Sequence, residues 1–336
     1  MAFVLSFAVA FGLSLLLTPL AGKAAIRLGI VDAPDHKLKS HKKPTPYLGG
    51  ASLFLSFALA VMIAKLMVFH TLHGVLAILA GSGLVFALGL VDDMVDLSPG
   101  VKFFGQGVAA GLLVFCSVHI QFIKVSWLSA LVTVVWVVGL TNAFNLIDVA
   151  DGLASGVALL AALAFFWVGA ETGKLNNMVL AAALAGSCLG FLRYNFFPAR
   201  IFMGDAGALF LGFTLAAVSM GESYSRVNEV AIVCPLLILG IPIFETFLLM
   251  AVRLAKGVSP FRGSHDHMVH RFERVGLTLK QGVLTLYGVT FTLCFLAILS
   301  IRLPLELVFL LYAAVGFAGL GFGIWMASIK METRKG

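Results

Sequence analysis

Five aspartates stand at the ends of apolar segments in a chain whose mean hydropathy is +1.04: Asp92, Asp93, Asp148, Asp151 and Asp205. A carboxylate near a membrane core is costly to bury and usually serves a function. Carboxylate oxygens bind divalent cations such as Mg²⁺, which in turn hold phosphate groups. These residues therefore predict a site for a divalent metal and a phosphorylated substrate.

The first acidic group, Asp92, Asp93 and Asp96, follows an apolar stretch, and Lys102 opens the next one. Adjacent helical residues point about 100° apart, so Asp92 and Asp93 can act separately, while Asp96 is expected to share a face with both. Negative charges at a helix C-terminus oppose the helix dipole. Two neighbouring carboxylates also favour a bound cation or the raised pKa of a general base. A solvated loop is the structural alternative.

Polar residues recur at every third position across the next boundary: Asn142, Asn145, Asp148 and Asp151. On one continuous helix each step of three residues turns by about 60°, so they are expected to form a slowly winding stripe. Carboxylate and amide oxygens together suit Mg²⁺. Alternatively, the asparagines pack between helices and Asp151 caps one.

Two further segments carry polar and aromatic residues. Asp205 precedes an apolar stretch, where it could cap a helix, and Phe202 before it could stack on a base or lie in the core. Pro44 and Pro46 hold a basic loop extended before Gly49 and Gly50, which are expected to open a helix whose N-terminus suits an anion. From this loop alone, a positive-inside flank with a turn is the favoured explanation.

Three histidines, two arginines and an aspartate gather between residues 259 and 272. Their spacing allows zinc, but the loops hold no cysteine and no His-Glu-x-x-His motif occurs. Histidine with arginine also suits a pyrophosphate, and a solvated basic loop is the plain alternative. Glu245 lies inside the preceding apolar stretch, where it could make an internal polar contact.

The elements that must position these residues are membrane helices. Hydrophobic residues make up 60% of the 336 and charged residues 12%, which excludes a soluble or disordered chain. We expect one all-α, polytopic integral membrane domain over 1–336, with its first apolar segment retained rather than cleaved. Eleven apolar stretches are near 2–22, 47–69, 73–91, 101–118, 127–146, 152–170, 176–195, 207–221, 229–253, 282–300 and 305–327.

Lysine and arginine fall mainly in loops after odd-numbered stretches; the opposite loops hold only Lys124, Lys174, Arg226 and Arg302. This asymmetry predicts an N-terminus outside, a C-terminus in the cytoplasm and all five aspartates at the cytoplasmic face. The net charge of +7 is thus a topology signal. Nucleic acid is not an expected partner, because the basic residues are dispersed among short loops.

Taken together, the motifs resemble one family. Pro-x-x-Gly-Gly at 46–50, Asp-Asp at 92–93, Asn-x-x-Asn-x-x-Asp-x-x-Asp-Gly at 142–152 and Phe-Met-Gly-Asp at 202–205 are similar to those of polyprenyl-phosphate N-acetylhexosamine-1-phosphate transferases. The resemblance implies a reaction at the cytoplasmic face of the bacterial inner membrane. There undecaprenyl phosphate attacks a UDP-N-acetylhexosamine, giving undecaprenyl-pyrophosphoryl-sugar and UMP, the first step of a cell-envelope polysaccharide such as O-antigen or teichoic acid.

The resemblance also implies residue roles. The Mg²⁺ (or Mn²⁺) ligands would be Asn145, Asp148 and Asp205, and the catalytic residues Asp92, Asp93 and His267, with Asp93 favoured as any base. The uridine would meet Asp151, Asn195 and Phe202, and the nucleotide and phosphates Lys43 and Lys102. The sugar-pyrophosphate loop would contribute His267, His270 and Arg271.

The chain departs from the family pattern in two places. Val149 follows Asp148 where glycine is common, and Val269 precedes His270 where the N-acetylglucosamine transferases commonly carry histidine. No run of three adjacent histidines occurs, which argues against a peptidoglycan pentapeptide substrate. N-acetylglucosamine is the first expectation, with N-acetylgalactosamine or a 6-deoxy-N-acetylhexosamine as alternatives; pairing of two copies stays open. An ion-coupled secondary transporter is the rival class, and a membrane metalloprotease a weaker one.

Overall fold

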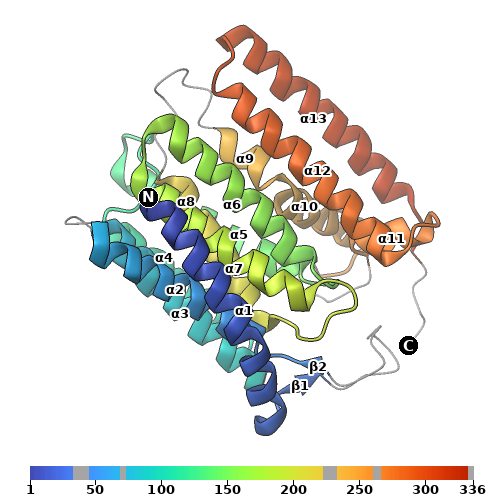
Figure 1. The fold of residues 1–336 in the computed structure, drawn as a ribbon. Coiled ribbons are helices and arrows are strands. Elements are labelled where there is room, and N and C mark those ends of the chain that lie inside the picture. Colours follow the sequence, from blue (N-terminus) through green and yellow to red (C-terminus); the bar gives the residue numbers. More distant parts are fainter. Residues whose placement is uncertain (33–44, 69–72, 222–232, 260–265, 332–336) are drawn as a thin grey trace. The chain divides into compact units, whose positions relative to one another are not determined.

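The computed structural model describes residues 1–32, 45–68, 73–221, 233–259 and 266–331, and Figure 1 traces the chain. Two compact units divide it, Met1–Glu222 and Ser223–Gly336. The first unit contains α1 (Ala2–Leu28), β1 (Val31–Asp32), β2 (Thr45–Pro46), α2 (Gly49–Val68), α3 (His73–Val95), α4 (Pro99–Phe115), α5 (Ser126–Ile147), α6 (Leu153–Thr172), α7 (Leu175–Asn195) and α8 (Gly204–Met220). The second contains α9 (Cys234–Ile238), α10 (Gly240–Ala255), α11 (Met268–Arg274), α12 (Leu279–Ser300) and α13 (Leu305–Ser328).

Eight helices among the described residues are long and apolar enough to cross a membrane: α1, α2, α3, α5, α6, α7, α12 and α13. The apolar helices α4 and α8 are shorter, at 17 residues each. The only strands in the described ranges, β1 and β2, form one short antiparallel pair. The expectation of an all-α polytopic membrane protein is therefore confirmed.

One expected span differs from the structure. The stretch 229–253 was predicted as a single helix, but its described part forms two, α9 and α10, separated at Leu239. Pro242 explains the break, because its ring has no N–H and would collide with the carbonyl of Ile238, four residues earlier. Ile238 is the last residue of α9.

The buried centre of the first unit is α8. It packs against α2, α3, α5 and α6, and every one of its residues except Asp205 is buried. Small side chains allow this burial, since Gly, Ala and Ser let helix backbones approach closely in a membrane. The single half-exposed residue of the central helix is thus an acid at its N-terminal end.

Glycines bring two neighbouring helices onto the N-terminal end of α8. A Cβ atom on Gly50 of α2 would lie 2.4 Å from the backbone N of Gly207, and one on Gly89 of α3 would lie 2.5 Å from Cα of Ala206. Both contacts are with backbone, which cannot move aside as a flexible side chain can. The acidic end of α3 is therefore held against α8 by a contact that only glycine permits.

The first helical N–H groups of α2 do not point at an open anion site. Gly49 donates its N–H to the carbonyl of Phe202, and Gly50 donates to the carbonyl of Met203, both at 2.9 Å. The expectation that this N-terminus holds an anion is wrong for these two groups, because the segment before α8 already satisfies them. Gly49 does open the helix, as predicted.

Replacing Gly89 with alanine is expected to weaken the first unit and the site together. The added methyl group would overlap Ala206 and force α3 away from α8, and such overpacking costs about 1–3 kcal/mol. The measurement is the thermal unfolding midpoint of detergent-purified protein. Gly107→Ala on α4 is the matched control, because its Cβ would meet nothing within 4 Å. An unchanged midpoint in the Gly89 variant would contradict the close packing.

Candidate active site

Four helix ends of the first unit bring the predicted acids together. The C-terminal ends of α3 and α5 meet the N-terminal ends of α4 and α8. Hydrogen bonds join their polar groups, which belong to Asp92, Asp93, Lys102, Asn145 and Asp205. These residues are separated by up to 113 positions in the chain. Aspartates that lie on the same side of the membrane, as the sequence predicts, can converge in this way.

Lys102 is the bridge between two of these acids. Its Nζ donates to Oδ2 of Asp92 and, at 3.1 Å, to Oδ2 of Asp205. The other oxygen of the buried Asp92 accepts the N–H of Leu97 at 2.7 Å. One ammonium thus ties the end of α3 to the start of α8, and its charge is shared by two carboxylates.

Asp93 binds the N-terminus of α8. Its Oδ1 accepts the N–H of Asp205 at 2.7 Å, and its Oδ2 accepts the N–H of Ala206 at 3.1 Å. The residue in the capping position of α8, Met203, makes no side-chain capping bond. Gly204 has a φ of 67°, and a Cβ there would lie 2.5 Å from Asp93. A carboxylate from another helix therefore performs the capping that the chain itself does not supply.

Besides its contact with the charged Lys102, Asp205 is contacted by a neutral residue at the end of α5. Asp148 lies just beyond the end of that helix. Asn145 donates its amide N–H to Oδ1 of Asp205 at 2.9 Å. Burial, together with the negative charges of Asp205, Asp93 and Asp151, raises the pKa of Asp148 to about 8. The described cluster contains four carboxyl groups and only one ammonium group, so its acidic groups outnumber its basic ones.

The donor chemistry of this cluster fits Mg²⁺. Asp205 and Asp148 offer carboxylate oxygens and Asn145 an amide oxygen, the hard ligands that this ion prefers. Within the described ranges no three acidic, histidine or cysteine side chains form a closed ligand group. Mg²⁺ is usually bound through one or two carboxylates and completed by water and substrate phosphates.

The predicted polar stripe on one continuous helix is wrong beyond Ile147. There α5 ends, and Asp148 occupies the capping position with a non-helical backbone. Asn142 remains on the helix and exchanges amide hydrogen bonds with the buried Gln106 of α4. Asp96 also leaves its helix, with a φ of 51°, and is exposed. Only Asp92 and Asp93 of that trio therefore belong to the cluster.

The residues expected near uridine surround the turns beside α6 and α8. Asp151 accepts the N–H of Ala199 at 2.8 Å. Asn195 is 3% exposed, and its amide oxygen accepts from the N–H of Gly152 and, at 2.9 Å, from Oγ of Ser155. Its amide nitrogen donates to the carbonyl of Ile201. Asn195 is thus an internal tie between segments, and contact with uridine stays a prediction.

Phe202 is half-buried and packs edge-on against Tyr47, with ring centroids 6.1 Å apart. Its N–H donates to the carbonyl of Pro46, so the segment before α8 lies along β2. Phe202 is held in place by backbone while its ring keeps partial exposure, as stacking requires. Lys43 lies outside the described residues.

The histidine segment belongs to the second unit and is described by itself. His267 precedes α11 and pairs through Nδ1 with Glu245 of α10 at 2.9 Å. His270 pairs with Glu273, also through Nδ1 at 2.9 Å. The internal polar contact expected for Glu245 is confirmed by this pair. The sequence assigned Glu245 no functional role, although a lone acid inside an apolar stretch is a signal of function.

Arg271 is the largest fully buried side chain of the described protein, at 1% exposure. It donates to the carbonyls of Asp266, Met326 and Ile329, and thereby satisfies the end of α13. Its Nη2 lies 3.7 Å from a carboxylate oxygen of Asp266. Burial lowers the pKa of Arg271, partly offset by the nearby acids. These contacts give Arg271 a structural role inside the unit, and its predicted substrate contact stays a prediction.

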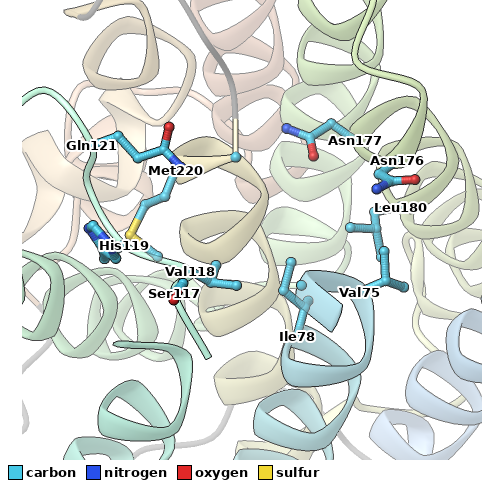
Figure 2. Close-up of a pocket in the computed structure, with 12 residues that line it drawn as sticks. Val75, Ile78, Ser117, Val118, His119, Gln121, Asn176, Asn177, Leu180 and Met220 are labelled. Atoms are coloured by element: carbon cyan, nitrogen blue, oxygen red, sulfur yellow. The ribbon is translucent and has the colours of Figure 1, made fainter. Parts of the chain in front are cut away.

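A cavity of about 120 Å³ lies at the other end of the first unit (Figure 2). Its lining includes Val75 from the start of α3, His119 after α4, Asn177 from the start of α7 and Met220 at the end of α8. The acidic cluster is at the opposite ends of α3 and α8. The cavity is therefore separate from the acids, and the acidic cluster is the candidate active site.

Comparison with known proteins agrees with the motifs. The family model for glycosyl transferase family 4 matches residues 75–222, which include the whole acidic cluster. A probable undecaprenyl-phosphate N-acetylglucosaminyl 1-phosphate transferase of Bacillus subtilis is 34% identical over 321 residues, 92% of this chain and 88% of that protein.

Two further relatives are more distant. A decaprenyl-phosphate N-acetylglucosaminephosphotransferase of Mycolicibacterium smegmatis is 33% identical over 300 residues, 78% of this chain and 73% of its own length. An undecaprenyl-phosphate alpha-N-acetylglucosaminyl 1-phosphate transferase of Escherichia coli is 28% identical over 275 residues, covering 78% and 74%. The chain belongs to glycosyl transferase family 4, among its polyprenyl-phosphate N-acetylglucosamine-1-phosphate transferases.

Proposed function

We propose that this protein transfers N-acetylglucosamine 1-phosphate from UDP-N-acetylglucosamine to undecaprenyl phosphate. The products are UMP and undecaprenyl-pyrophosphoryl-N-acetylglucosamine. The lipid-linked sugar is the first intermediate of a cell-envelope polysaccharide. One observation carries the proposal: four helix ends gather four carboxylates, a lysine and an asparagine at one end of an apolar bundle. The names of the relatives support undecaprenyl phosphate as the acceptor and N-acetylglucosaminyl 1-phosphate as the transferred group.

The chemistry is a displacement at phosphorus. An oxygen of the lipid phosphate forms a bond to the β-phosphorus of the donor, and the bond to the bridging oxygen breaks, so UMP leaves with that electron pair. Such a reaction needs alignment and charge neutralisation more than covalent help. Lys102, shared between Asp92 and Asp205, supplies one positive charge at the cluster. Bound Mg²⁺ at Asn145, Asp148 and Asp205 would neutralise the pyrophosphate oxygens.

The need for a base is small. A phosphate monoester has a second pKa of about 6, so the attacking oxygen of the lipid phosphate is mostly ionised at neutral pH. Asp93 already accepts two backbone N–H bonds, and these hold Asp205 in position. Asp93 as the base and Asp92 as its catalytic partner stay proposals beside this positioning role.

The remaining assignments belong to the same proposal. Phe202 stacks on uridine near Asp151 and Asn195, while Lys43, His267, His270 and Arg271 serve the phosphates and sugar. The site faces the cytoplasm of a bacterial inner membrane, with the N-terminus outside and the C-terminus inside. Lysine and arginine asymmetry supports this orientation, and the shared end of the acids in the first unit is consistent with it.

UMP release tests the function directly. Purified protein in detergent is mixed with undecaprenyl phosphate, Mg²⁺ and UDP-N-acetylglucosamine, UDP-N-acetylgalactosamine or a UDP-6-deoxy-N-acetylhexosamine. Release with the first donor, and only in the presence of lipid phosphate, is the expected result. Release with another donor alone would replace the sugar but keep the reaction. No release with any donor from folded protein would overturn the proposal and favour the transporter alternative.

Removal of divalent cations is expected to stop UMP release, and added Mg²⁺ to restore it. The proton on Asp148 competes with the metal, because the pKa of this carboxyl is raised to about 8 and a ligand must be deprotonated to bind. As the pH rises from 6.5 to 8.5, the Mg²⁺ concentration that gives half the maximal rate should therefore fall. Asp148→Asn should flatten that dependence. An unchanged Mg²⁺ requirement across this range would contradict the role of Asp148.

A further inference from the structure

We propose that Glu245 is a positioning residue for His267. It fixes the imidazole so that Nε2 is the ring nitrogen available to the donor's pyrophosphate. This inference rests on the proposed function, because it assigns His267 to a substrate phosphate. It adds a residue from α10 to the machinery of the histidine segment.

The carboxylate of Glu245 holds this segment at two adjacent points. Its Oε1 lies 2.9 Å from Nδ1 of His267, and its two oxygens accept the N–H of Met268 at 3.1 and 3.2 Å. Glu245 is 2% exposed, and His267 is 6% exposed. The ring and the backbone that carries it are thus fixed by one side chain from another helix.

The contact determines which ring nitrogen is free. A carboxylate accepts and does not donate, so Nδ1 of His267 carries the hydrogen whether the ring is neutral or charged. Nε2 has no hydrogen-bond partner among the described residues, and the one wholly buried side-chain nitrogen or oxygen there without a partner is Nη2 of Arg271. Nε2 of His267 therefore keeps contact with solvent. In functional histidines, a hydrogen bond from one ring nitrogen to a second group usually fixes the tautomer and the orientation of the ring.

Burial separates this pair from an ordinary surface contact. His270 and Glu273 also pair through Nδ1 and a carboxylate oxygen at 2.9 Å, but they lie three residues apart on one short helix, and the side chain of Glu273 is 43% exposed. Solvent screens such a pair and leaves it little effect. Glu245 instead carries its charge within an apolar helix, where burial of a carboxylate is costly. A capping bond to Met268 needs no charge, so the carboxylate is explained by the histidine.

A double-mutant cycle separates positioning from a purely structural role. Glu245→Leu is expected to lower kcat for UMP release by about tenfold to a hundredfold, with little change in KM for undecaprenyl phosphate. In a His267→Ala background the same substitution should cost no further activity, because residues that act as a unit are non-additive. Multiplicative losses in the cycle would overturn the proposal. Glu273→Gln, the matched control, should stay within about twofold of the parent protein.

Further variants keep the test valid if Glu245→Leu folds poorly. Glu245→Asp and Glu245→Gln retain an acceptor and should recover part of the activity, the aspartate more than the amide. Loss in both equal to that of leucine, in protein with an unchanged unfolding midpoint, would count against positioning.

A spectroscopic readout does not depend on activity. Nitrogen-15 NMR of histidine-labelled protein, with the signal assigned by His267→Ala, should show Nδ1 protonated in the parent protein. In Glu245→Leu that preference should be lost. If the parent protein releases no UMP, the proposed function fails, whereas a parent signal with Nδ1 unprotonated refutes the inference by itself.

Discussion

Asp205→Asn is expected to lower the rate of UMP release by at least about a hundredfold without destabilising the protein. The substitution preserves shape but removes the charge that faces Lys102 and, in the proposed site, Mg²⁺. Asp205 is the one residue of α8 that is not buried, so its loss leaves no cavity in the core. Removing one of four neighbouring carboxylates also relieves their repulsion, and the unfolding midpoint should stay the same or rise.

Two measurements test the proposed role of Asp205 in activity and in metal binding. UMP release gives the loss of activity, and the binding of Mn²⁺ to purified protein gives the loss of metal affinity. Asp96→Asn is the matched control, because Asp96 is exposed, and asparagine tolerates its left-handed backbone. Activity of the Asp205 variant close to that of the control would remove Asp205 from the site.

The apolar pattern predicted most of the fold because a membrane span depends on a long local run of one property. Nearly every boundary lies within a few residues of its prediction, as in α5, expected at 127–146 and observed at Ser126–Ile147. The exception, the break between α9 and α10, depends on a steric effect of Pro242 that hydropathy does not detect.

The acids of the cluster were only partly predictable, and for a different reason. Charged side chains at membrane depth have few alternatives to function, so type and position pointed to Asp92 and Asp93. Asp205, taken alone, could equally have been a helix cap. The division of labour among them was not predictable, because it depends on contacts between distant segments. Asp93 binds backbone N–H groups of α8 and Lys102 bridges two acids, and neither contact leaves a local signal in the sequence.

The glycines show the same limit. Gly49 and Gly50 were predicted to open a helix and did so, but their N–H groups bind carbonyls before α8 rather than an anion. Gly89 lies in an apolar stretch where no local pattern distinguishes it, yet it permits the backbone contact that holds α3 on α8. A close approach between helices is a property of two segments, whereas a sequence pattern describes one.

Asp93→Ala is expected to lower both stability and activity, whereas Asp205→Asn lowers activity alone. The alanine substitution leaves the N–H groups of Asp205 and Ala206 without their acceptor, and an unsatisfied donor costs about 1–3 kcal/mol. The unfolding midpoint should therefore fall along with activity, because Asp205 loses its fixed position. Asp93→Asn keeps one amide oxygen as an acceptor and should lie between the parent protein and the alanine variant in stability.

Stability and activity together distinguish the two roles open to Asp93. A residue that serves only as a base can be replaced by alanine with full loss of activity and an unchanged unfolding midpoint. A residue that caps α8 cannot, and part of its lost activity should return in Asp93→Asn, which cannot act as a base at all. Activity in the asparagine variant would thus show that Asp93 works by holding Asp205, whereas complete inactivity with normal stability would return the role of base to Asp93.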